Sequence, residues 1–152
     1  MPKPTADHRR LEKVAGHWTG TEKMYPSPWD PKGGEAKGTT TARVGLDGFA
    51  VIIDYEQSRG GTCTFKGHGV YTWDAGSKQV VLHWFDCMGQ GVEEFRGAWN
   101  GDRLRLESRN KTGFARMDYD FSKPGKMTSS MQMSSDGKSW STLFDGKYEL
   151  QD

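Results

Sequence analysis

The sequence has few hydrophobic residues, no long hydrophobic run and almost no net charge. Only 34% of its 152 residues are hydrophobic, and no apolar run approaches the roughly 18 residues of a membrane-spanning helix. The 21 Lys and Arg residues nearly balance the 20 Asp and Glu residues, and no basic run alternates with aromatic residues. We therefore expect neither a nucleic acid nor a membrane as a partner.

Signals for export and for thiol chemistry are also lacking. Residues Met1 to Arg10 contain no apolar core of a signal peptide, so we expect a cytoplasmic protein. The two cysteines, Cys63 and Cys87, lie in strand-like runs without the spacing of a CxxC motif. This pattern argues against a disulfide scaffold and against a redox motif, and it predicts reduced, packed thiols.

Glycine and aromatic residues are what the chain has in abundance. It contains 20 Gly, six Trp, five Tyr and seven Phe residues, although its mean hydropathy is only −0.82. Disordered chains are poor in aromatic residues because they cannot bury enough apolar surface to offset the loss of chain entropy. The composition therefore predicts a folded protein, and the length predicts a single domain over residues 1–152.

One short helix is expected before the strands. Thr5 can cap its start, Leu11 and Val14 belong to a small apolar stripe, and Gly16 can supply the left-handed residue that ends it. A helix of this length can act as a lid but not as a layer of the fold.

From His17 onward the chain consists of short runs with a period of two, separated by turn residues. The segment Tyr25 to Gly38 is the exception, because it holds three prolines and is too long for a hairpin turn. We expect it to be a lid or a binding loop. The ten predicted strands are His17 to Met24, Thr39 to Leu46, Phe49 to Ser58, Thr62 to Trp73, Lys78 to Cys87, Val92 to Trp99, Arg103 to Ser108, Gly113 to Phe121, Met127 to Ser134 and Trp140 to Glu149.

Ten short antiparallel strands can form either a closed barrel or two stacked sheets. A simple meander closes when its last strand pairs with its first, and closure removes the exposed strand edges. A sandwich with Greek-key crossovers needs long connections, and only Tyr25 to Gly38 is long enough. We therefore predict an all-β fold, a ten-stranded antiparallel up-and-down closed barrel with a short N-terminal helix.

A motif at the start of the first strand carries a family resemblance. Gly16-His17-Trp18-Thr19-Gly20 resembles the Gly-x-Trp signature of the calycin superfamily of lipocalins and fatty-acid-binding proteins, and with Tyr25-Pro26 after it looks more like the nitrobindin branch. Nearly the whole chain is similar to a bacterial family of calycin-like domains of unknown function. The resemblance implies a ten-stranded barrel with an internal cavity and assigns no activity. The segments that carry it are Gly67-His68-Gly69-Val70-Tyr71, His83-Trp84-Phe85-Asp86 and Ser135-Asp136-Gly137-Lys138-Ser139-Trp140.

The resemblance also bears on cofactors. Nitrobindins bind haem through a histidine near the carboxy-terminal strands, whereas the last histidine here is His83. We therefore expect no haem and no other cofactor. Lipocalins stack a basic residue of the last strand on the buried Trp, and Lys147 is the candidate partner for Trp18 in this chain.

Strand alternation predicts a cavity wall of Met and aromatic side chains in the last two strands. Met adapts to irregular shapes and aromatic rings stack, so such a wall suits a small, largely apolar or aromatic ligand. The first hypothesis is therefore a protein that binds such a small molecule in the barrel, beneath the segment Tyr25 to Gly38. The predicted ligand contacts are Tyr25, Trp29, Tyr55, Phe85, Met131, Met133 and Phe144.

The alternative is a cofactor-independent isomerase, lyase or hydrolase with acid–base groups in the same cavity. Glu22 shares a strand face with Trp18, which the resemblance places inside the barrel. Alternation alone leaves open whether His68 and the pair Asp54 and Glu56 point inward or outward. The candidate catalytic residues are His68, His83, Glu22, Asp54 and Glu56.

The turn before Lys78 decides which residues face one another across the strands that it joins. A two-residue loop sets His68 opposite His83, whereas a three-residue loop sets Cys63 opposite Cys87, which is the pairing we favour. No metal site is expected, because the ligand types near His83 alternate in direction along one strand. Whether the chain forms a homodimer is left open.

Overall fold

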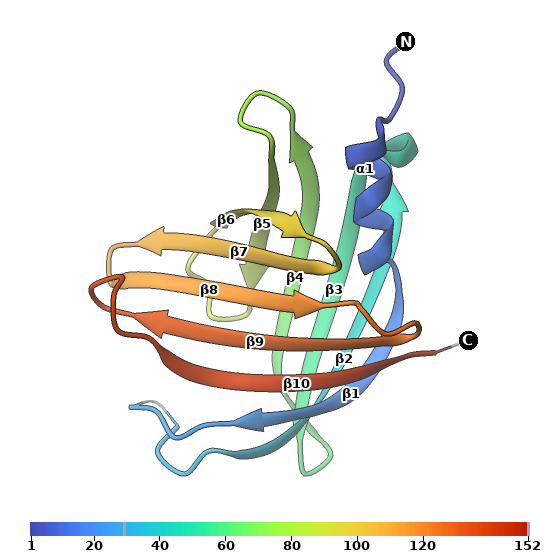
Figure 1. Cartoon of the computed structure of the whole chain (residues 1–152). Coiled ribbons are helices and arrows are strands. Elements are labelled where there is room, and N and C mark those ends of the chain that lie inside the picture. The colour runs from blue at the N-terminus through green and yellow to red at the C-terminus, as the bar shows by residue number, and fades with distance from the viewer. Residues whose placement is uncertain (29, 152) are drawn as a thin grey trace.

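A computed structural model of the chain describes residues 1–28 and 30–151 and shows ten antiparallel strands in one closed barrel (Figure 1). Each strand pairs with its neighbours along the chain, and β1 (Gly16–Met24) pairs with β10 (Ser141–Gln151) to close the barrel. The predicted up-and-down barrel is confirmed, and the alternative of two stacked sheets is wrong. The other strands are β2 (Gly34–Gly45), β3 (Ala50–Arg59), β4 (Thr62–Asp74), β5 (Gln79–Asp86), β6 (Glu93–Asn100), β7 (Arg103–Asn110), β8 (Gly113–Asp120) and β9 (Lys126–Ser134).

The short N-terminal helix is confirmed and closes one end of the barrel. It consists of α1 (Ala6–Arg10) and a 3₁₀ turn, η1 (Leu11–Val14), while a second 3₁₀ turn, η2 (Leu46–Gly48), joins β2 to β3. Only η1 buries side chains, with Leu11 at 0% and Val14 at 6% exposure. Among the described residues, no helix is long and apolar enough to cross a membrane.

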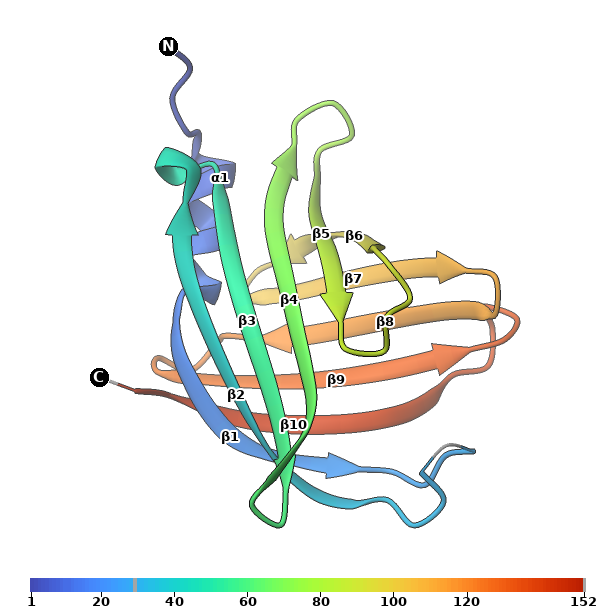
Figure 2. The same cartoon turned by 180° about the vertical axis from the view of Figure 1, so that it is seen from behind.

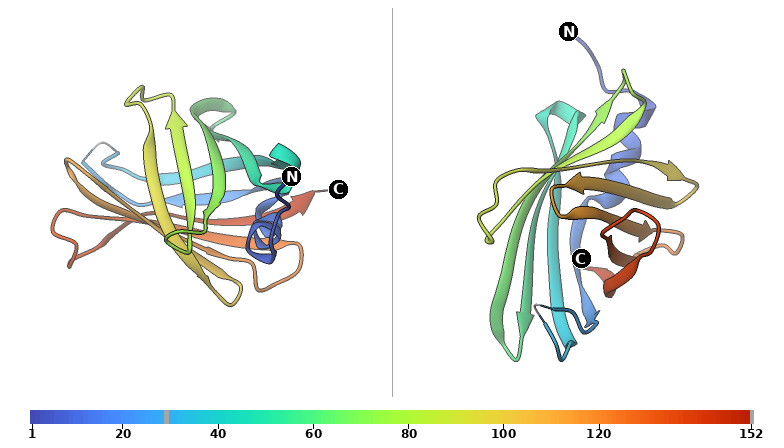
Figure 3. Two further views of the ribbon diagram at one scale, coloured as in Figure 1. Left: turned by 90° about the horizontal axis from the view of Figure 1, so that it is seen from above. Right: turned by 90° about the vertical axis from the view of Figure 1, so that its left-hand side faces the viewer.

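The strands on the two sides of the barrel run in different directions. Strands β2 to β4 cross β7 to β10 at a steep angle, and β1 bends from one direction into the other (Figures 1 and 2). Seen from above, α1 lies beside the turn between β2 and β3 (Figure 3). We call this end of the barrel, with the turns 75–78, 101–102 and 121–125, the helix end. We call the opposite end the loop end, and its connections are 25–33, 60–61, 87–92, 111–112 and 135–140.

The largest difference from the predicted strands is at β2. It begins at Gly34, opposite Met24, so the connection after β1 is shorter than the predicted segment Tyr25 to Gly38. The inward positions at the start of β2 are Gly34, Ala36 and Gly38, which alternate with charged residues. A strand whose inner side chains are this small shows no apolar period of two, and for this reason the sequence pattern missed it.

Both predicted registers for the hairpin of β4 and β5 are wrong. The strands pair Asp74 with Gln79 and His68 with Phe85, so the turn has four residues. The carboxylate of Asp74 accepts hydrogen bonds from the backbone amide of Gly76 and the hydroxyl of Ser77, and thereby stabilises this longer turn. Neither the two histidines nor the two cysteines face each other.

Alternate residues of each strand point into the barrel and form its core. The core is densest toward the helix end, where Val51, Tyr71, Val80 and Leu104 are each at most 1% exposed. The indole nitrogen of Trp18 donates a hydrogen bond to the carbonyl oxygen of Val14 at 3.1 Å, which ties η1 to β1. The helix end is therefore closed by packed side chains.

Candidate functional site

A buried carboxylate lies inside the barrel between strands β1, β3 and β10. Glu22 is 1% exposed, and both of its carboxylate oxygens accept hydrogen bonds. The hydroxyl of Tyr55 donates to Oε1 and Oε2 at 2.7 and 2.8 Å, the amide of Gln57 donates to Oε1 at 3.0 Å, and the hydroxyl of Tyr148 donates to Oε2. Glu22 thus faces the interior, as expected from its strand face, while its catalytic role stays a prediction.

The backbone leaves room for this carboxylate at Gly38. A Cβ atom at this position would lie 2.6 Å from Oε2 of Glu22, which is closer than a side chain allows. The register of β1 and β2 places Gly38 opposite Gly20, one step from Glu22 along the inner face. The missing side chain of β2 therefore makes the space that Glu22 occupies.

The two tyrosines that bind Glu22 are held in their protonated form. Burial raises the pKa of Tyr55 well above its usual value, and the negative charge of Glu22 raises it further. The same two causes, in the same order, raise the pKa of Tyr148. Both hydroxyl groups therefore remain hydrogen-bond donors to the carboxylate over the whole physiological pH range.

Several inward-facing Met and aromatic side chains at the loop end are less buried than core residues such as Val51, Tyr71 and Leu104. Phe65 and Trp84 on one side, and Met131, Met133 and Phe144 on the other, are all partly exposed although they point into the barrel. Since they point inward, their exposed area faces space within the barrel mouth. We call this solvent-accessible part of the inner face the open region.

Trp84 lies flat against β4 because two glycines leave room for its ring. A Cβ atom at Gly67 would overlap the six-membered ring of Trp84, and one at Gly69 would lie 3.1 Å from it. The indole nitrogen of Trp84 donates to Oδ2 of Asp86 at 3.0 Å, which fixes the ring along the strand. This arrangement places the flat face of the Trp84 ring along the wall of the open region, so the ring does not block that region.

Two further carboxylates face the interior at the loop end. Glu93 pairs with Trp84, and Asp86 lies two residues further along β5, so both share the inner face. Burial raises the pKa of the Glu93 carboxyl, and the charge of Asp86 raises it further, while a hydrogen bond from Asn110 opposes the shift. The mouth of the barrel is therefore acidic.

The remaining candidate catalytic residues lie on the outer face. Nδ1 of His68 lies 2.7 Å from Oδ1 of Asp54, and these side chains are 49% and 70% exposed. His83 contacts Glu94 at 3.2 Å and is 45% exposed, and Glu56 is an exposed partner of Lys66. Any acid–base reaction inside the barrel would therefore have to use the inward carboxylates Glu22, Asp86 or Glu93. The four outward candidates are His68, His83, Asp54 and Glu56.

Two of the predicted ligand contacts are also corrected. Phe85 is 46% exposed on the outer face, because its neighbours Trp84 and Asp86 occupy the inward positions of β5. The hydroxyl of Tyr25 donates to Oδ2 of Asp145 at 2.7 Å, which places the ring beside the outer face of β10. Trp29 lies outside the described residues. The predicted contacts that do face the open region are Tyr55, Met131, Met133 and Phe144.

Lys147 and the cysteines also differ from expectation. Lys147 is exposed and points away from Trp18, whose ring packs edge-on against Phe121 at a centroid distance of 5.9 Å. Cys63 and Cys87 are free, as predicted, but exposed and not packed. Within residues 1–28 and 30–151, no group of three or more His, Cys, Asp or Glu side chains is arranged to hold a metal ion.

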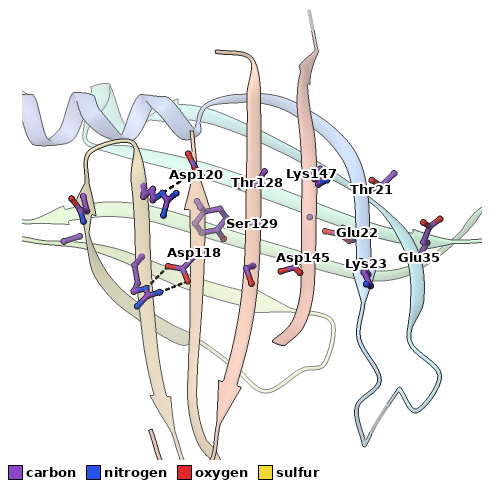
Figure 4. Close-up of a pocket in the computed structure, with 17 residues that line it drawn as sticks. Thr21, Glu22, Lys23, Glu35, Asp118, Asp120, Thr128, Ser129, Asp145 and Lys147 are labelled. Atoms are coloured by element: carbon purple, nitrogen blue, oxygen red, sulfur yellow. Dashed lines mark hydrogen bonds and ion pairs between the residues drawn. The ribbon is translucent and has the colours of Figure 1, made fainter. Parts of the chain in front are cut away.

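A second hollow, of about 930 Å³, lies on the outer face of β6 to β10, β1 and the start of β2 (Figure 4). Its lining includes pairs of residues two apart on a strand, such as Arg103 with Arg105, whereas the inward Leu104 between them is fully buried. Asp118 and Asp120 of β8 form ion pairs with these two arginines. Its outward charged residues look like an ordinary solvated sheet face in the sequence, so no signal there predicted the hollow.

Comparison with known proteins shows the family and the fold. Residues 3–149 match the family described as "Protein of unknown function (DUF1579)". The chain belongs to this family. No curated protein matches the chain.

Solved structures with the same fold include two distant ones. The crystal structure of Rv2717c from M. tuberculosis is 13% identical over 97% of this chain and 99% of its own, with a TM-score of 0.72. The S-type phycobiliprotein lyase CPES from Guillardia theta is 12% identical over 98% of each chain, with a TM-score of 0.63. At these identities, the likeness shows that the DUF1579 chain shares their barrel fold and nothing more.

Proposed function

We propose that the protein binds a small, largely apolar or aromatic ligand in the barrel interior, and that the ligand enters at the loop end. The observation that carries the proposal is the partial exposure of inward Met and aromatic side chains at this end, whereas the core residues Val51, Tyr71 and Leu104 are at most 1% exposed. Met131, Met133 and Phe144 line this region opposite Trp84. Met and aromatic side chains favour apolar or aromatic bodies, because they adapt in shape or stack.

The Glu22 network supports a binding role more than a catalytic one. Both oxygens of the carboxylate already accept hydrogen bonds from Tyr55, Gln57 and Tyr148. A carboxylate with satisfied hydrogen bonds is held in place, and it ties three strands together behind the open region. We assign the Glu22 network a structural role as a rigid polar boundary of the binding region.

The proposal needs no haem or other cofactor. It treats the chain as a calycin-like binding barrel because the segment Gly16–Gly20 resembles the calycin signature. A barrel of the same fold is a phycobiliprotein lyase, and this name supports a ligand-handling role for the architecture. Because fold does not determine function, the assignment depends on a binding experiment.

Titration with N-phenyl-1-naphthylamine, a neutral apolar probe whose fluorescence rises in apolar sites, tests the proposal. The wild-type protein is expected to bind it saturably. Met131→Lys places a charge in the interior and should weaken binding by about tenfold or more. The matched control is Ser130→Lys, at the adjacent outward residue of β9, which should bind like the wild type.

Near-ultraviolet circular dichroism shows whether each variant is folded. If Met131→Lys does not fold, Met133→Lys repeats the test nearer the rim. A wild-type protein that binds neither this probe nor a broad panel of apolar and aromatic compounds would refute the proposal. Equal binding by the folded interior variant and its control would refute the assigned location.

A further inference from the structure

Three aromatic rings form a continuous wall at the loop end of the interior. Ring centroids of Tyr55 and Phe65 lie 6.1 Å apart, and those of Tyr55 and Trp84 lie 6.3 Å apart. The rings come from three adjacent strands, β3, β4 and β5, and all three are partly exposed. Faces of aromatic rings attract cations, because their π electrons give them a negative electrostatic potential.

The charges on the inner face next to this wall have one sign. Asp86 lies in the same row as Tyr55 across β4, with only Gly67 between them, and Glu93 lies opposite Trp84. Glu22 lies behind Tyr55. Glu22, Asp86 and Glu93 therefore place three carboxylates beside this wall.

The basic residue at the end of β3 does not neutralise them. Nη2 of Arg59 lies 2.6 Å from Oδ2 of Asp30 in the connection 25–33, and this ion pair lowers the pKa of the Asp30 carboxyl. Lys66 points to the outer face and contacts Glu56 at 3.5 Å. Within the described residues, the carboxylates of the mouth face the aromatic wall without a basic partner on the inner face.

The two mouth carboxylates differ in how well they are satisfied. Asp86 accepts hydrogen bonds from the indole of Trp84 and from the backbone amide of Met88. Glu93 has a hydrogen bond from Asn110 but is half-buried beside this negative charge, and burial and the charge of Asp86 together raise its pKa. A positive charge placed between them would relieve the repulsion and the cost of burial.

We propose that the ligand of the interior is an organic cation, an amine or quaternary ammonium on an apolar or aromatic body. Its positive group lies against the faces of Tyr55 and Trp84 within reach of Asp86 and Glu93, and its body extends toward Met131 and Phe144. This inference rests on the proposed function and adds the charge of the ligand to it.

Three probes with one aromatic body separate charge from shape. They are 2-naphthylmethyl-trimethylammonium, 2-naphthalenemethanol and 2-naphthoate, each titrated into the protein at neutral pH by calorimetry. The cation is expected to bind about tenfold more tightly than the alcohol, and the anion more weakly than both. High salt should reduce the advantage of the cation.

Variants of the mouth carboxylates locate the effect. The double variant Asp86→Asn with Glu93→Gln should weaken binding of the cation by about tenfold and leave binding of the alcohol unchanged. The matched control is Glu94→Gln, the adjacent outward carboxylate, which contacts His83 and should change neither.

The outcomes distinguish this inference from the proposed function. If N-phenyl-1-naphthylamine binds but the cation has no advantage over the alcohol, or the anion binds best, the inference is overturned and the binding role stands. An advantage of the cation that survives the double variant also overturns the inference. If neither N-phenyl-1-naphthylamine nor any of the three probes binds, the proposed function fails as well.

Discussion

The hydroxyl oxygen of Tyr55 lies 2.7 Å from Oε1 and 2.8 Å from Oε2 of Glu22, so one side chain of β3 serves both oxygens of a carboxylate on β1. With 1% of Glu22 exposed, water cannot replace a donor that is lost. A buried acceptor without its partner carries the full cost of its desolvation. The stability of the barrel should therefore depend on this hydroxyl group.

Tyr55→Phe is expected to lower the free energy of unfolding by about 1–3 kcal/mol. The ring and its packing remain, so the loss reports on the hydroxyl alone. Urea unfolding followed by circular dichroism measures it. Tyr25→Phe is the control, because its hydroxyl bonds to Asp145 on the outer face, and its loss should be clearly smaller. Equal losses in the two variants would show that burial of Glu22 contributes nothing.

Every tyrosine of the chain should resist ionisation in the folded state. Burial is the largest cause of the raised pKa of four of them, and a hydrogen bond to Asp145 is the largest cause for Tyr25. Their pKa values in the unfolded chain are near 10. The folded state therefore keeps its full stability below about pH 10 and loses it as the pH rises further, because only the unfolded chain releases the protons.

Ultraviolet absorbance of tyrosinate checks this prediction. Between about pH 10 and the onset of alkaline unfolding, the native protein should show almost no tyrosinate, and the signal should then rise together with the loss of circular dichroism. The chain in guanidinium chloride is the reference and should titrate near pH 10 with all five tyrosines. A native titration that matches this reference would contradict the burial of these hydroxyl groups.

The barrel was predictable because most of its inner positions are large and apolar. In β3, the inner positions Val51, Ile53 and Tyr55 are apolar or aromatic, whereas the outer positions Asp54 and Glu56 are charged, and such a pattern indicates a strand with one buried face. The start of β2 was missed because Gly34 and Ala36 carry no such signal. Further along the same inner face, Gly38 is small because Glu22 occupies the space that a side chain would need.

The site was harder to predict than the fold because it depends on contacts between distant strands. Glu22 could be placed inside from its position relative to Trp18, but Tyr148, 126 residues away, looks like an ordinary wall residue. The relation of His68 to its neighbours depended on a turn that the side chain of Asp74 stabilises. A shift of register changes every cross-strand pair between β4 and β5. The hydrogen bonds of Asp74 within the turn therefore decide which residues of these strands face each other.

Gly67 should be needed for the position of Trp84. Gly67→Val places a side chain where the ring lies and is expected to cost about 1–3 kcal/mol of stability by overpacking. The displaced ring should also shift the Trp fluorescence and weaken binding of N-phenyl-1-naphthylamine. Gly76→Ala, in the exposed turn between β4 and β5, is the control and should change neither. Unchanged fluorescence in the Gly67 variant would show that Trp84 does not lie against β4.

Leu11 should hold the helix end closed. Its side chain is 0% exposed and belongs to the same buried cluster as Val51, Tyr71 and Leu104, whereas α1 itself buries no residue. Leu11→Ala should therefore lower the free energy of unfolding by about 2–5 kcal/mol and speed hydrogen exchange in α1 and η1. Glu12→Ala, at the adjacent exposed position, should leave both nearly unchanged. Ligand binding at the loop end should not depend on this closure, so both variants should bind N-phenyl-1-naphthylamine with the same affinity. A large loss of this affinity in Leu11→Ala alone would instead place the entrance at the helix end.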